Sequence, residues 1–307
     1  MPHLSGSGLI SAAGGLSDQS TYNFAAGGGG RVAIDYDPVQ QASADVTGLM
    51  ISAAGGEYAS LDCRLATRDN EETAAEAGTL HFSDVALVKR LFGTGLSGRV
   101  VGLKTLSFEG DLAFTRGCFS SMEEGFELTV GGDLLVSGEE ARLEVGGVLT
   151  TNLASHATVW AGRSLNKLTV GGDFTVEKGG SFLIRSAETN ATLAWGGEVR
   201  VAGAMTVGSN GYVYASCDGR NCGAPRFLPG SLTVDRYGVL SADRRGGLGA
   251  CNLAQLSSIL GYTPSRYGFG LGAGKNAAAS HGGVGGWGLV YSSGVTGTPG
   301  ALWDNEW

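Results

Sequence analysis

The sequence is poor in proline, lysine and histidine, and each shortage excludes a class of protein. Only 6 of the 307 residues are proline although 54 are glycine, so the glycine does not come from a collagen or a proline-rich linker. Lysine accounts for 5 of the 21 basic residues, and the net charge is −8. No basic patch stands out, which argues against nucleic acid as a partner. The four histidines stand apart from one another and form no catalytic motif.

Long apolar runs and targeting signals are also missing. No run of 18 apolar residues occurs, so the sequence predicts no membrane insertion. The N-terminal residues show no basic segment followed by an apolar one, so no secretory signal peptide is visible. Apolar residues still make up 42% of the chain, which is enough for a core and is not typical of a disordered protein.

The five cysteines are an odd number, so at least one thiol is unpaired within the chain. Cys217 and Cys222 bracket the short polar segment CDGRNC, and we predict a disulfide between them, with two free thiols as the alternative. A zinc site would need a second Cys or His pair nearby, and none is present. The sequence does not assign partners to Cys63, Cys118 and Cys251.

The clearest feature that is present is a short strand pattern that recurs along the chain. LTVGGDLLV stands at 128–136 and LTVGGDFTV at 168–176. Related copies begin at Leu106, Leu143, Leu193, Met205 and Leu232. Within each copy apolar residues alternate with others, which is the period of a β-strand. We expect the glycines to form corners with positive φ.

Strands this short need many neighbours to be stable, because each unit must cover the apolar face of the last one. A unit of about 20–25 residues with two or three strands suits one coil of a parallel β-helix. We therefore predict an all-β fold, a right-handed parallel β-helix or β-solenoid with glycine-rich loops. The two nonapeptides would lie two coils apart, with the copy at Leu143 between them on an adjoining face. An antiparallel sandwich is the alternative.

The chain divides into three regions of different character. Residues 1–103 form a glycine-rich β-solenoid segment with two ISAAGG copies and a polar excursion near 59–78. DVALVKRLFG at 84–93 fits either a strand or a short helix. Residues 104–245 form the coils with LTVGG-type turns. Residues 246–307 form a glycine-rich loop region, which we interpret as the truncated start of a further repeat.

Three phrases resemble a known kind of module: GGGGRVAI at 27–34, LTVDRYGVLSAD at 232–243 and SHGGVGG at 280–286. They are similar to the glycine-rich repeat modules of very large surface proteins of bacteria and some unicellular eukaryotes. The resemblance implies a β-helical fold, an extracellular or cell-surface location, and neighbouring repeats of the same longer chain as partners. It implies no catalytic residues. Both ends of the sequence would then be cut from a longer polypeptide.

Asp111, Asp133 and Asp173 follow glycine in equivalent turns, and Glu198 takes the matching place in a later copy. If these turns stack, the carboxylates align, and a cation such as Ca²⁺ would relieve their repulsion. The alternative is that each Asp accepts backbone N–H bonds in its own turn. Ca²⁺ is the one cofactor that this pattern suggests.

β-Helices host polysaccharide lyases and glycoside hydrolases, but no compact cluster of Asp, His, Lys and Arg is visible, so we expect no enzyme. Aromatic side chains could stack on sugar rings in a glycan-binding module; the candidates are Trp160, Trp195, Tyr212 and Tyr214. We expect a non-enzymatic, adhesin-like structural segment of a larger surface protein, a stiff spacer that presents loops and contacts cell-surface or extracellular glycans.

Overall fold

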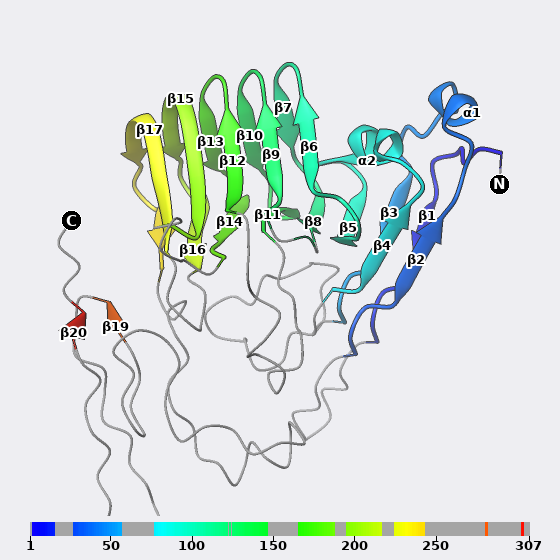
Figure 1. Cartoon of the computed structure of the whole chain (residues 1–307), viewed down its shortest axis with the longest axis horizontal. Helices are drawn as coiled ribbons and strands as arrows, with labels where there is room; N and C mark the ends of the chain where they lie inside the picture. The colour runs from blue at the N-terminus through cyan, green and yellow to red at the C-terminus, as the bar shows by residue number, and fades with distance from the viewer. Residues whose placement is uncertain are drawn as a thin grey trace, which may run out of the picture.

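The computed structural model describes most of residues 2–242 and two short strands beyond them (Figure 1). The described residues are 2–15, 27–56, 77–121, 123, 125–146, 165–187, 195–216, 224–242, 280–281 and 302–303. They form an all-β structure in which every strand pair is parallel, with two short helices near the N-terminus. The predicted all-β class is therefore confirmed.

Two large sheets contain most of the strands. The ten-stranded sheet contains β1 (Leu9–Ser11), β2 (Arg31–Ile34), β3 (Met50–Ser52), β4 (Thr79–Phe82), β5 (Leu96–Val100), β8 (Gly117–Ser121), β11 (Ala141–Val145), β14 (Ser181–Arg185), β16 (Tyr212–Ser216) and β18 (Val239–Ser241). The eight-stranded sheet contains β6 (Thr105–Phe108), β7 (Leu112–Phe114), β9 (Glu127–Val130), β10 (Leu134–Ser137), β12 (Asn166–Val170), β13 (Phe174–Glu177), β15 (Gly197–Val207) and β17 (Pro225–Val234). The strands β19 (Ser280–His281) and β20 (Leu302–Trp303) pair separately.

The eight-stranded sheet has two arms that meet in its longest strands. In one arm β6, β9, β12 and the first half of β15 pair in sequence order; in the other β7, β10, β13 and the second half of β15 do the same. The register between β15 and β17 shifts between Val201 and Ala204, where each strand passes from one arm to the other. We call one strand of each arm, followed by one strand of the ten-stranded sheet, a pass.

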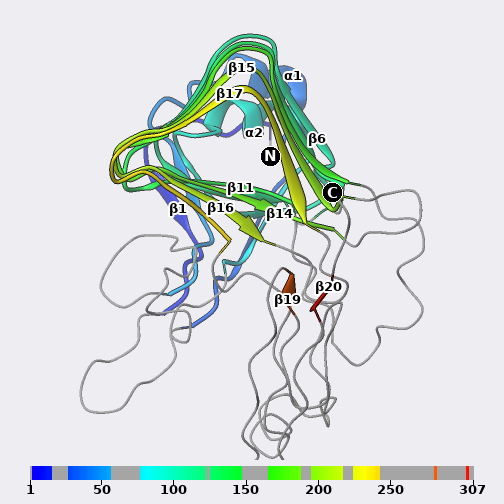
Figure 2. The same ribbon diagram turned by 90° about the vertical axis from the view of Figure 1, so that its left-hand side faces the viewer.

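Alternating side chains explain why these short strands stack. In β9 and β12 the Leu and Val of LTV are buried and the Thr between them is partly exposed. Leu128 pairs with Leu168, and Leu168 pairs with Val199, so apolar side chains of successive passes form continuous columns. Figure 2 looks along the stack and shows the strands of successive passes superimposed on three sides of one core.

The core is filled from all three sides by large side chains. Phe174 of β13 and Phe182 of β14 are both fully buried, with ring centroids 5.1 Å apart in an edge-to-face arrangement.

The apolar columns become exposed at the last described pass. Val207 of β15 is 0% exposed, whereas Val234, its partner on β17, is 46% exposed. The end of the described stack therefore presents an apolar surface.

The pairing corrects the predicted interval between the two nonapeptides. Leu128 is the direct neighbour of Leu168, so the 40-residue interval is one pass and not two. The chain between β11 and β12 is long, and this extra length made the interval look like two coils. The copy at Leu143 does lie on a different side, in β11 of the ten-stranded sheet, as expected.

The two ISAAGG copies lie side by side near the N-terminus. Ile10 of β1 pairs with Ile51 of β3, and β2 pairs with β4 in the same way. The glycines after β1 and β3 lie where there is no room for a side chain. A Cβ on Gly14 would lie 1.9 Å from the carbonyl oxygen of Gly27, and a Cβ on Gly56 would lie 1.9 Å from the carbonyl oxygen of Gly15. Backbones that approach this closely leave no room for a side chain.

Two short helices flank this N-terminal sheet. In α1 (Pro38–Ala42) Asp37 is the N-cap and accepts from the amides of Val39 and Gln40. The segment that fitted a strand or a helix forms α2 (Val85–Leu91), capped by Asp84. The Tyr36 hydroxyl donates to Asp84 Oδ1 at 2.6 Å. Burial, followed by this hydrogen bond, raises the pKa of Tyr36 well above its usual range.

Candidate functional site

The predicted aspartate turns do stack in the corner between the two arms of the eight-stranded sheet. Asp111 Oδ1 accepts the backbone N–H of Asp133 at 2.8 Å, and Asp133 Oδ1 accepts that of Asp173 at 2.8 Å. Asp173 Oδ1 then accepts the N–H of Ala204 at 2.7 Å. Each carboxylate therefore holds the turn of the next pass, and not its own turn as the alternative supposed.

The glycines before Asp133 and Asp173 have a steric role. A Cβ on Gly132 would lie 2.0 Å from Asp111 Oδ1, and one on Gly172 would lie 2.0 Å from Asp133 Oδ1. Neither glycine has a φ in the left-handed region, so the expected positive-φ corner is wrong here. Glycine recurs at the second position of GGD because the carboxylate of the preceding pass occupies the space that a Cβ would need.

The calcium column stays a prediction. The three carboxylates align as that prediction requires, but Oδ1 of each is already bonded to a backbone amide. Within the described ranges, no three side chains of His, Cys, Asp or Glu gather as a metal site would need.

Glu198 does not occupy the matching place in this column, contrary to the expectation. The position after Asp173 belongs to Ala204, and Glu198 lies earlier, in the first arm of the sheet. There it pairs with Lys167 of β12 on one side and with Arg226 of β17 on the other. The local match of LAWGGEV to LTVGGD is misleading, because its two glycines lie at the start of a strand: Gly196 directly precedes β15, and Gly197 is its first residue.

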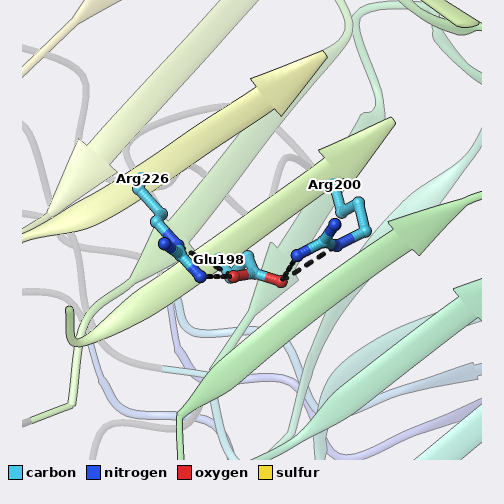
Figure 3. A network of polar contacts seen from close by, with 3 residues as sticks. All are labelled: Glu198, Arg200 and Arg226. Atoms are coloured by element: carbon cyan, nitrogen blue, oxygen red, sulfur yellow. Dashed lines mark hydrogen bonds and ion pairs between the residues drawn. The ribbon is translucent and has the colours of Figure 1, made fainter. Parts of the chain in front are cut away.

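Glu198 is the centre of an arginine network on the outer surface of this arm (Figure 3). Its Oε1 accepts from Nε and Nη2 of Arg200, both at 3.2 Å. Its Oε2 accepts from Nε and Nη2 of Arg226 at 2.8 and 2.5 Å. Arg200 lies two residues further along the same strand and Arg226 directly across on the next, so strand geometry places both guanidinium groups beside one carboxylate.

The carboxylate is buried although it belongs to an outward-facing position. The Glu198 side chain is 4% exposed, whereas those of Arg200 and Arg226 are 53% and 38% exposed. Burial alone would raise the pKa of Glu198, but the hydrogen bonds and charges of Arg226 and Arg200 outweigh it and lower the pKa. Glu198 is therefore ionised at neutral pH, and the three groups together carry a net charge of about +1.

Trp195 lies next to this network. The Arg226 guanidinium carbon is 6.0 Å from the centroid of the Trp195 ring, at the limit of a cation–π contact. Trp195 itself is partly exposed. The predicted glycan residue Trp195 thus lies beside charged groups that sequence reasoning did not connect with it.

The other predicted glycan residues lie elsewhere. Tyr212 and Tyr214 are both on β16, partly exposed, with nearly parallel rings whose centroids are 6.3 Å apart. They belong to the ten-stranded sheet, whereas Trp195 precedes a strand of the eight-stranded one. Trp160 lies outside the described residues.

The cysteine prediction lies largely outside the described residues, which include neither Cys217 nor Cys222, nor Cys63 and Cys251. Cys118 is buried in β8.

Comparison with protein families, curated proteins and solved structures finds no match. Within the described part of the chain, no helix is both long enough and apolar enough to cross a membrane.

Proposed function

We propose that this chain is a right-handed parallel β-helix segment of a larger extracellular surface protein, and that it serves as a stiff, adhesin-like spacer that presents loops. The observation that carries the proposal is the regular pass: parallel strands of successive passes stay in register on three sides of one core. A stack of this kind resists bending because every pass is hydrogen-bonded and packed against its neighbours.

The distribution of chain length supports the loop-presenting role. Links between the first and second strand of a pass, such as 109–111, 131–133 and 171–173, are short. Links from the third strand to the next pass are longer, and 146–165 and 186–196 are the longest. Extra sequence is therefore confined to one of the three corners.

Shape and exchange measurements test the spacer role. We expect small-angle X-ray scattering of the full chain to fit an elongated body, and we expect hydrogen exchange in β9 to β14 to be much slower than the intrinsic rate of an unfolded chain. Amides of β9 and β12 that exchange at the intrinsic rate of an unfolded chain would overturn the stacked arrangement.

Location is tested on intact cells that express the native gene. Mild protease treatment should remove the epitope of an antibody raised against this chain, without lysis and without loss of a cytoplasmic marker. An epitope that is lost only after permeabilisation would refute the surface location.

A further inference from the structure

Two guanidinium groups that are bonded to one carboxylate lie next to an indole ring on this arm of the sheet. Each arginine has five N–H donors, and Arg200 and Arg226 each direct the Nε and Nη2 edge at Glu198. The side chains of Arg200 and Arg226 are 53% and 38% exposed, so both remain accessible to a ligand while they are bonded to Glu198. Figure 3 shows the two groups on opposite sides of the one carboxylate.

The local charge favours an anion. Lys167 is in register with Glu198 on one side and with Glu127 on the other. With Arg200 and Arg226 included, the five side chains carry a net charge of about +1. This patch is locally positive on a chain whose net charge is −8. Guanidinium groups bind carboxylates and sulfates through paired, charge-assisted hydrogen bonds, which are stronger than neutral ones.

The network also limits the mobility of the arginines. An exposed arginine normally loses side-chain freedom when it binds a ligand, and this loss weakens binding. Here the buried Glu198 carboxylate holds both side chains in place before any ligand arrives. The role of Glu198 in such a site is positioning, because its negative charge on its own would repel an anion.

We propose that Arg200 and Arg226, held by Glu198 and flanked by Trp195, bind an acidic polysaccharide through its carboxylate or sulfate groups. Trp195 lies beside Arg226 and is partly exposed, and an indole next to a guanidinium group favours a sugar, whose ring can contact it, over a simple anion. The proposal goes beyond the spacer role. Its failure would leave that role untouched, since scattering and hydrogen exchange test the spacer independently.

Affinity electrophoresis of the full chain tests the site, with polygalacturonate as the carboxylate probe, dextran sulfate as the sulfate probe and uncharged dextran as the neutral one. We expect retardation by one or both acidic polymers and none by dextran. Arg200→Gln and Arg226→Gln should each weaken binding by about tenfold. Arg116→Gln is the matched control, because Arg116 is 51% exposed, pairs with Glu140 and lies outside the network; its affinity should stay within twofold.

The Glu198→Gln variant distinguishes a site with positioned arginines from non-specific attraction by net positive charge. It removes the one negative charge of the network, so attraction of an anion by charge alone would become stronger. If the carboxylate positions the arginines, the same substitution weakens binding, by about threefold or more. Stronger binding by Glu198→Gln would overturn the proposal, and so would equal losses in Arg200→Gln and Arg116→Gln.

Two further measurements keep the result interpretable. Circular dichroism of each variant checks folding, and the exposed Arg200→Gln carries the test if Glu198→Gln does not fold. A single-stranded DNA oligonucleotide serves as a competing polyanion. Tighter binding of DNA than of either acidic polysaccharide would overturn the assignment to a glycan.

Discussion

Substitution of Gly172 by alanine tests whether the glycine of GGD is required for space. The added methyl would lie 2.0 Å from Asp133 Oδ1, so the carboxylate must move and give up its bond to the Asp173 amide. Loss of that exposed hydrogen bond costs about 1 kcal/mol. Crowding adds about 1 kcal/mol, and the reduced freedom of the unfolded chain returns about 0.5 kcal/mol. We expect a net destabilisation of about 1.5 kcal/mol.

The decisive measurement is a double-mutant cycle. Asp133→Ala removes the carboxylate, so Gly172→Ala in that background should cost less than about 0.5 kcal/mol, which leaves a coupling of about 1 kcal/mol. Unfolding in guanidinium chloride, followed by circular dichroism, gives each free energy if the slope m is unchanged. Equal costs of Gly172→Ala in the two backgrounds would refute the reasoning.

Gly171 provides the control. A Cβ there would lie 2.2 Å from the backbone oxygen of Gly131, which no side-chain substitution can remove. Gly171→Ala should therefore cost about 3 kcal/mol, and the cost should be the same with or without Asp133.

Three further predictions concern the core, the network and the end of the stack. Phe174→Ala should cost about 3–5 kcal/mol in the same unfolding assay, because the ring is fully buried. The pKa of Glu198 is lowered in the folded state, so its contribution to stability is present above about pH 4.5 and is lost as the pH falls further; Glu198→Gln should flatten the fall in stability below pH 4.5. Val234→Ala should destabilise by less than half as much as Val207→Ala, because only Val207 is fully buried.

Each of these has an outcome that would contradict it. A Phe174→Ala variant as stable as Thr175→Ala, a change on the outward side of the same strand, would show that β13 is not packed as described. A steeper acid loss in Glu198→Gln than in the wild type would reverse the inferred pKa shift. Equal costs at Val234 and Val207 would mean that the end of the stack is covered in solution.

Strand identity was predictable because it depends on local alternation. In the LTV copies of β9 and β12 the Leu and Val are buried and the Thr is partly exposed, as the pattern indicated. The separation of Leu143 from the other copies was also predictable, because its short spacing left no room for a full pass. Helix α1 carried a readable signal, an Asp37 cap followed by Pro38, that the strand-like surroundings concealed.

The register of passes was not predictable, because it depends on links that carry no pattern. The link between β11 and β12 is about as long as a whole predicted coil, so its length alone suggests an additional coil. The arginine network was not predictable for the same reason. Pairing between β15 and β17 brings Glu198 and Arg226 together, and their separation in the sequence does not indicate that they are neighbours. A carboxylate column could be proposed from sequence, whereas its amide partners on the next pass required the pairing.

The uneven link lengths have a consequence for how such a chain can change. An insertion of one residue in 131–133 or 171–173 would shift the following strand by one position and turn its apolar side chains outward. An insertion in 146–165 would leave every paired residue of β11 and β12 in place. Insertions and deletions can therefore accumulate at one corner while the other two stay constant in length, and a foreign peptide grafted for display belongs at that corner.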